Sequence, residues 1–135
     1  MNIIKEMNLE EEGFFKFLDL HILEIDKGYA KVYISITDNL KRKGNILHGG
    51  AIFSTLDYAG SIAVHTLDNV VDQYTIEVKI NFMKPVRGQK FVGIAKVIEE
   101  GKRIVFVELN GYDDDKLSVK GIGTWYVVRK SEVYR

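Results

Sequence analysis

The stretch GAIFSTLDYAGSIAVHTL, residues 50–67, decides the fold of this chain. Its larger apolar side chains recur at helical spacing and no proline interrupts it, so we expect one long helix here. Small residues such as Ala59, Gly60 and Ala63 would let a sheet approach the helix backbone closely. Close approach explains why a glycine is tolerated, although it costs about 1 kcal/mol relative to alanine inside a helix. The helix is therefore predicted to be wrapped by a sheet.

The segments on both sides of this helix have the pattern of β-strands. Upstream, apolar and polar side chains alternate over residues 28–36, and a turn at residues 26–28 makes residues 20–25 either a separate strand or a bulged extension. Residues before 20 are irregularly spaced, which suits one or two short helical turns packed on the body. Four downstream runs are rich in Val, Ile and aromatic residues: 74–83, 90–99, 103–112 and 117–128.

The turns between the last three runs are too short for parallel crossovers, so the sheet is predicted to be largely antiparallel. In the run 74–83, the apolar residues from Ile76 to Phe82 alternate with the polar residues from Thr75 to Asn81, which predicts one buried face and one polar face. One long helix covering one face of a sheet gives a two-layer α+β domain.

Length and composition limit the class of protein. The 135 residues are enough for one domain and too few for two stable cores, so residues 1–135 are predicted to form a single domain. Nineteen basic and nineteen acidic residues leave no overall field to attract nucleic acid or an anionic membrane. The lack of cysteine excludes disulfides, thiolate metal sites and a cysteine nucleophile. No signal peptide or membrane span is recognisable, so we expect a soluble, cytoplasmic protein.

Two glycines, Gly49 and Gly50, directly precede the predicted helix, and His48 precedes them. The first N–H groups of a helix have no partner within it, and the helix dipole places partial positive charge there. A substrate carbonyl on the N–H of Gly49 or Gly50 would be polarised, and each such donor contributes about 2.7–4 kcal/mol to a transition state. The alternative is a simple tight turn into the helix, which the two glycines alone favour.

Asp57 lies in an otherwise apolar, small-residue part of the predicted helix, where a carboxylate is costly unless it is solvated or paired. It shares one helix face with Ser54, Ser61 and His65, at spacings of three and four residues. This polar stripe is either a solvated surface or the lining of a cleft. In the second case Asp57 could act as a general base on water or as a direct nucleophile.

The sequence NILHGGAIFSTLD, residues 45–57, resembles the signature of the PaaI-type hotdog thioesterases. TIEVKINFMKP, residues 75–85, is similar to the second strand of that family, and GKR, residues 101–103, to its next hairpin. The similarity extends over roughly residues 14–128 in the same element order. It implies a hotdog fold, in which a largely antiparallel five- to six-stranded sheet wraps one central helix. It also implies hydrolysis of an acyl- or arylacyl-CoA to free acid and CoA, with no cofactor and no metal.

The resemblance assigns roles to the residues of the site. The aspartate that matches Asp57 is catalytic in that family, and its pocket is shared between two chains, one of which supplies the glycine turn. A homodimer would then be obligatory for activity, and we expect a homotetramer. His48 either orients the thioester region or is a locally bonded histidine at the start of the helix. Thr75 either holds the attacking water or is an ordinary strand residue.

Candidates for substrate binding come mainly from charge. CoA carries phosphates, so basic residues at strand ends are expected to contact them. The predicted binding residues are Asn45, Ser54, Lys84, Arg87, Lys102 and Arg103. Several relatives have an asparagine six residues before the histidine, where this chain has Arg42, and the role of Asn45, three residues before it, is open.

Two other functions are compatible with the same fold. A non-catalytic sensor or scavenger could bind acyl-CoA with the same glycine turn, but Asp57 argues against it. A hotdog dehydratase or hydratase would use a different His/Asp or His/Glu arrangement, which the sequence lacks. His21 and His65 have no spacing that suggests a metal site, and Trp125 is predicted to lie in the core or an interface.

Overall fold

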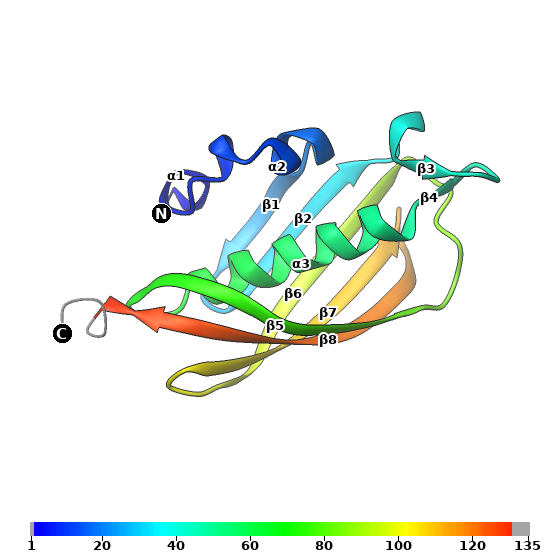
Figure 1. The fold of residues 1–135 in the computed structure, drawn as a ribbon. Helices are drawn as coiled ribbons and strands as arrows, with labels where there is room; N and C mark the ends of the chain where they lie inside the picture. Colours follow the sequence, from blue (N-terminus) through cyan, green and yellow to red (C-terminus); the bar gives the residue numbers. More distant parts are fainter. Residues whose placement is uncertain (1, 131–135) are drawn as a thin grey trace.

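The computed structural model describes residues 2–130, in which one antiparallel sheet curves around one long helix (Figure 1). The helix is α3 (Gly49–His65). The six strands lie in the order β1 (His21–Asp26), β2 (Tyr29–Ser35), β6 (Lys90–Glu100), β7 (Ile104–Asp113), β8 (Lys116–Arg129) and β5 (Val70–Phe82). The predicted α+β architecture, with a central helix wrapped by an antiparallel sheet, is confirmed.

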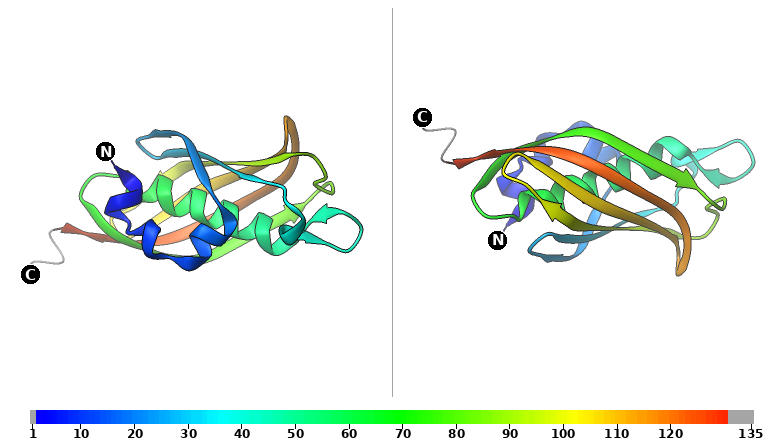
Figure 2. Two further views of the ribbon diagram at one scale, coloured as in Figure 1. Left: turned by 90° about the horizontal axis from the view of Figure 1, so that it is seen from above. Right: turned by 90° about the horizontal axis from the view of Figure 1, so that it is seen from below.

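Short elements occupy the two ends of the helix. Before the sheet, α1 (Ile3–Glu6), the 3-10 turn η1 (Leu9–Glu11) and α2 (Gly13–Leu18) lie beside α3 (Figure 2), three short helical elements where one or two were predicted. Between β2 and α3 come η2 (Asp38–Leu40) and a small hairpin of β3 (Lys41–Arg42) and β4 (Ile46–Leu47). Within residues 2–130, no helix has the length and hydropathy needed to cross a membrane.

The core lies between α3 and the concave face of the sheet. Alternate residues of β7, Val105 and Val107 among them, face the helix and are fully buried. Gly60 of α3 packs on the indole of Trp125, where a Cβ atom would lie only 2.2 Å from the ring. The predicted close approach of the sheet to the small residues of the helix is therefore confirmed, and Trp125 is a core residue.

Most predicted boundaries agree with the structure to within two residues, and residues 21–26 form a separate strand. The start of β5 was predicted wrongly at Tyr74, because the strand already begins at Val70. Residues 70–73 include Asp72 and Gln73, whose polarity hides a segment that pairs with the end of β8.

The prediction for the two faces of β5 also needs correction. The register with β8 shifts between Thr75 and Glu77, so a β-bulge at Ile76 interrupts the alternation. Thr75 pairs with the buried Trp125 and faces α3, whereas the prediction placed it on the polar face with Glu77. The apolar face is only partly buried within one chain, because Ile76 and Phe82 are each 55% exposed.

Candidate active site

The glycine turn forms the first turn of α3, and the structure distinguishes its two glycines. His48 is the N-cap residue, and its Nδ1 accepts a hydrogen bond from the Gly50 N–H at 2.8 Å. This hydrogen bond caps the first turn of α3 with the imidazole of His48. The His48 carbonyl accepts from the N–H groups of Ala51 and Ile52. Within residues 2–130, the N–H of Gly49 has no hydrogen-bond acceptor.

Asp57 lies on the third turn of α3 and is half-buried. Its Oδ1 accepts a hydrogen bond from the Thr75 hydroxyl at 2.7 Å. Burial raises the pKa of Asp57, and the hydrogen bond from Thr75 acts in the opposite direction. The bulge at Ile76 makes this contact possible, because it turns Thr75 toward the helix. A half-buried carboxylate with a raised pKa beside a hydroxyl is typical of a general base.

Asp57 opens onto a cleft of about 270 Å³ between α3, β5 and the N-terminal segment. We call it the aspartate cleft. Its lining residues are Met7, Leu9, Glu12, Phe14, Phe53, Ser54, Asp57, Tyr58, Ser61 and Gln73. Three of the four residues of the polar stripe therefore line this cleft, and His65 lines a neighbouring one.

A second cleft, of about 300 Å³, lies toward the start of α3 and is mainly apolar. We call it the apolar cleft. Its lining residues are Phe14, Phe17, Leu18, Asn39, Leu40, Lys41, His48, Gly50, Ala51 and Ser54. Phe14 and Ser54 belong to both clefts, so the two adjoin along the helix.

The other polar residues of the stripe have protein partners. The Ser54 hydroxyl donates to the Gly50 carbonyl at 2.8 Å, and the Ser61 hydroxyl oxygen accepts from the Trp125 indole N–H at 3.0 Å. His65 is buried, and its Nδ1 lies 2.9 Å from Nε2 of Gln73. Burial lowers the pKa of His65, and the nearby Glu6 and Asp72 act in the opposite direction.

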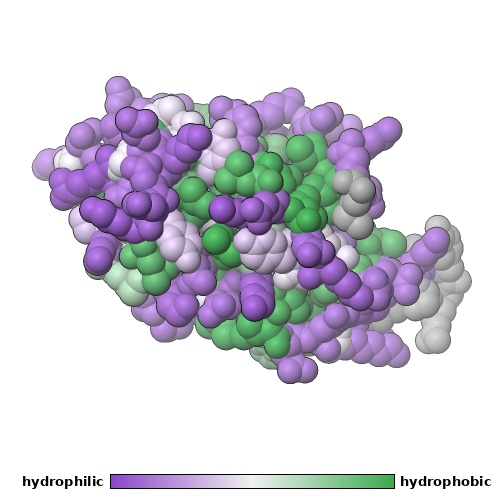
Figure 3. All heavy atoms as spheres, turned by 180° about the vertical axis from the view of Figure 1, so that it is seen from behind, coloured by the Kyte–Doolittle hydropathy of each residue, from purple (hydrophilic) through white to green (hydrophobic). Residues whose placement is uncertain are grey.

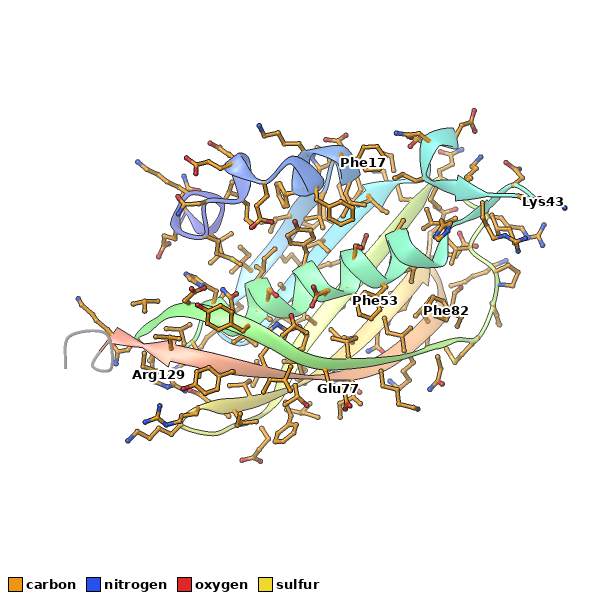
Figure 4. The ribbon with its side chains drawn as sticks, viewed as in Figure 1. Phe17, Lys43, Phe53, Glu77, Phe82 and Arg129 are labelled. Atoms are coloured by element: carbon orange, nitrogen blue, oxygen red, sulfur yellow. The ribbon has the colours of Figure 1, made fainter. Side chains whose placement is uncertain are left out.

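Within one chain, the glycine turn and the carboxylate are too far apart to contact one substrate carbonyl. Gly49 and Asp57 are eight residues apart on one helix, which corresponds to about 12 Å along its axis. The ring of Phe82 lies near Gly49, since a Cβ atom added to this glycine would be 3.6 Å from the ring. Phe82 and Phe53 lie together on one side of α3, and Phe17 lies on the opposite side, at α2 (Figure 4).

Two of the predicted binding residues lie near the glycine turn. Lys84 lines a cleft of about 340 Å³ together with Gly49, Phe82 and Arg42. Asn45 is exposed, has a left-handed backbone with φ of 61°, and its Oδ1 accepts from Lys41 Nζ at 2.8 Å.

The remaining basic residues lie elsewhere on the chain. The Arg87 backbone N–H donates to Asp113 at 3.0 Å, in the loop that precedes β6. Lys102 and Arg103 lie in the turn between β6 and β7, where Arg103 Nη1 donates to the Tyr126 hydroxyl at 3.2 Å. This turn and the glycine turn lie at opposite ends of the folded molecule (Figure 1).

Several residues that line these clefts were missed by sequence reasoning, among them Phe14, Tyr58 and Gln73. Gln73 precedes Thr75 by two residues on the same strand, so period-two reasoning finds it once β5 is extended to Val70. Tyr58 follows Asp57 on α3 and lies four residues after Ser54, so helical spacing also finds it, whereas Phe14 depends on how the N-terminal segment packs. Among the described residues, no group of three or more His, Asp or Glu side chains is placed to hold a metal ion.

Comparison with known proteins identifies the family to which the chain is similar. Residues 44–120 match the sequence profile of the thioesterase superfamily. The chain is 44% identical over 131 residues to "Putative esterase SSO1253" of Saccharolobus solfataricus, covering 95% of this chain and 87% of that protein. It is 21% identical to the medium/long-chain acyl-CoA thioesterase YigI of Salmonella typhimurium, covering 95% and 93% of the two chains.

The solved structure of PaaI, from the phenylacetic acid degradation operon of E. coli, is also similar. It superimposes with a TM-score of 0.82 at 21% identity, covering 90% of this chain and 88% of PaaI. At this identity the likeness establishes a shared fold, and the predicted hotdog fold is confirmed.

Proposed function

Since the chain belongs to the thioesterase superfamily and is a thioester hydrolase, we propose that it hydrolyses an acyl- or arylacyl-CoA to the free acid and CoA. The predicted relationship to PaaI-type thioesterases is confirmed by this membership and by the fold. The observation that carries the proposal is the half-buried Asp57, which has a raised pKa and opens onto a cleft. The acyl-CoA activity in the name of the relative YigI supports the substrate class.

The proposed reaction uses Asp57 as a general base. The Thr75 hydroxyl donates to Oδ1 of Asp57, which leaves Oδ2 and the hydroxyl lone pairs to hold a water molecule. Asp57 takes a proton from this water as its oxygen attacks the thioester carbonyl carbon. The oxyanion that forms accepts from the free N–H of Gly49. The carbon–sulfur bond then breaks, and the departing thiolate takes the proton from Asp57. Direct attack by Asp57 is the alternative, in which the carboxylate first forms an anhydride with the acyl group.

This reaction requires two chains, because one chain cannot bring Gly49 and Asp57 to one carbonyl. β5 is an edge strand of the described sheet, and its exposed apolar residues are Val71, Tyr74, Ile76 and Phe82. An open edge with such residues is a surface on which a second strand can pair.

The contacts of β5 define how a second copy would pair. Phe82 lies near Gly49, and the Thr75 hydroxyl donates a hydrogen bond to Asp57. Antiparallel pairing of β5 with its copy about a two-fold axis at Lys79 would place Phe82 of one chain opposite the bulge at Ile76 of the other, beside Thr75. Gly49 of one chain would then approach Asp57 of its partner. We therefore propose an obligatory homodimer.

The outer face of the sheet supports a further association of dimers. Viewed from behind, the surface is mostly hydrophilic but carries several hydrophobic patches (Figure 3). Phe106 is 39% exposed and Ile122 is 47% exposed, on neighbouring strands of the outer face. Exposed apolar groups of this kind mark an interaction surface, so the proposed assembly is a homotetramer. The molar mass from light scattering would distinguish it from a dimer.

The basic residues are proposed to hold the phosphates of CoA. Lys84 and Arg42 stand at the cleft that contains Gly49, and Arg87 follows in the same segment. Lys102 and Arg103 lie in the turn between β6 and β7, at the opposite end of the folded molecule (Figure 1). In the proposed two-fold dimer, this end of the partner would lie alongside the glycine turn of the first chain.

The proposal is tested by the release of free CoA thiol from a panel of short, medium, long-chain and aromatic acyl-CoAs. We expect turnover of at least one class. Tight binding of these compounds without thiol release from any of them would overturn the hydrolysis and favour the non-catalytic sensor. The same panel added to a buffer blank and to Asp57→Ala protein controls for spontaneous hydrolysis.

A further inference from the structure

The short helix α2 carries two exposed aromatic side chains that line the clefts. Neither side chain is needed to pack α2 on the core. Phe14 and Phe17 are 53% and 54% exposed, whereas the neighbouring Phe15 is buried and packs into the core. Phe17 lines only the apolar cleft, but Phe14 lines both the apolar cleft and the aspartate cleft. Phe14 therefore stands at the boundary between them.

Contacts with α3 fix the position of Phe14. Its ring stacks on the ring of Tyr58 with centroids 6.5 Å apart, and Phe15 meets the same ring edge-on at 5.3 Å. The Tyr58 hydroxyl donates to Glu12 Oε1 at 2.5 Å, which ties the residue before α2 to the helix. Tyr58 is the residue after Asp57, so α2 is anchored beside the proposed general base.

The two clefts differ in chemistry. The aspartate cleft contains Asp57, Ser61 and Gln73, whereas the apolar cleft is walled mainly by hydrocarbon from Phe17, Leu18 and Leu40. A cavity of about 150 Å³ is enough for benzene. The aspartate cleft, at about 270 Å³, therefore suits a short or single-ring acyl group, and a longer chain needs the apolar cleft as well.

We propose that Phe14 is a specificity-determining residue that closes the aspartate cleft against the apolar cleft and limits the acyl group to a short chain or a single ring. This inference rests on the proposed function, because it takes the reacting carbonyl to lie at Asp57. Removal of the Phe14 ring would join the two clefts, so that methylenes beyond the wild-type limit become buried.

The test compares kcat/KM over a series of straight-chain acyl-CoAs for wild type, Phe14→Ala and Phe14→Trp. Each methylene that gains burial corresponds to about a fourfold gain. For chains two carbons beyond the wild-type optimum, Phe14→Ala should therefore raise kcat/KM about sixteenfold relative to kcat/KM at that optimum. Phe14→Trp should move the optimum to shorter chains. Lys16→Ala is the matched control, since Lys16 is exposed on the same helix and lines neither cleft.

The outcomes separate this inference from the proposed function. An active wild type whose relative chain-length profile is the same in all four proteins would overturn the role of Phe14 and leave the hydrolase intact. A wild type without turnover on any acyl-CoA would overturn the proposed function itself. Phe14 is half-exposed, so circular dichroism should show all variants folded.

Discussion

The first turn of α3 and its third turn contribute to the site in different ways. At the first turn, the donor of Gly49 is a consequence of local geometry, because every helix begins with unpaired N–H groups. At the third turn, Asp57 depends on a residue 18 positions away, Thr75, which a β-bulge turns toward it. The first half of the site thus depends on local helix structure, and the second half depends on a tertiary contact. About 12 Å of helix separates them, so in the proposed dimer each would complement the other half from the partner chain.

Of the changes considered, removal of the Asp57 carboxylate should lower the turnover rate most. Asp57→Ala is expected to lower kcat by about 10²–10⁴-fold with KM little changed, because a general base acts in the transition state. Thiol release measures the rate, and circular dichroism checks the fold. Loss of the folded state, or a kcat within tenfold of wild type, would contradict the catalytic role.

Removal of the Gly49 N–H tests the other half of the site, at the first turn of α3, and leaves the charge of the protein unchanged. Gly49 is the first helical residue, where proline is well accommodated, and His48 before it is already extended, with ψ of 136°. Gly49→Pro removes the N–H, adds a pyrrolidine ring in its place, and should lower kcat by about 10²–10³-fold. Gly49→Ala is the matched control, because it keeps the N–H and its Cβ atom fits at 3.6 Å from Phe82. Equal activity of the two variants would refute the donor role.

The link between Asp57 and Thr75 should appear in the pH dependence. The hydrogen bond from Thr75 lowers the pKa of Asp57, so its removal in Thr75→Val should raise that pKa. A base must be deprotonated to act, so the acidic limb of the kcat/KM profile should move to higher pH. A limb that stays in place or moves to lower pH would show that Thr75 does not set the pKa of the base.

The smallest effect concerns stability. Burial raises the pKa of Asp57, so the stability that the protonated form contributes is present below the ordinary carboxyl range and is lost as pH rises through the raised pKa. Asp57→Asn stays neutral and can still accept from Thr75. Its Tm should exceed that of wild type by a few degrees at pH 7, and the difference should shrink near pH 4. A lower Tm at pH 7 would contradict a desolvated carboxylate.

The fold was predictable because its signals are periodic and local. The apolar spacing of residues 50–67 specifies α3, and alternation specifies the central strands. Alternation failed at the start of β5 and at the bulge in its middle. The segment from Val70 is held by pairing with β8, and the bulge at Ile76 is set by the register of that pair. Neither depends on the sequence of β5 alone.

The site was predictable to the extent that it is local or resembles a known family. The glycine turn could be derived from helix physics, whereas the importance of Asp57 and Thr75 came from the resemblance. The structure adds the reason why the two residues belong together, which is their hydrogen bond. Phe14 and Gln73 were missed because they reach the cleft through packing of segments that are distant in sequence.

A mixing experiment tests most directly whether the site is shared between two chains. Asp57→Ala and Gly49→Pro proteins are each unfolded, mixed and refolded together, with each variant refolded alone as the control. In a mixed dimer, Gly49 of the first variant meets Asp57 of the second and forms one intact site. Recovery of about a quarter of the wild-type activity is expected, since half of the dimers are mixed and each has one of two sites. Activity no higher than that of the separate variants would contradict a shared site.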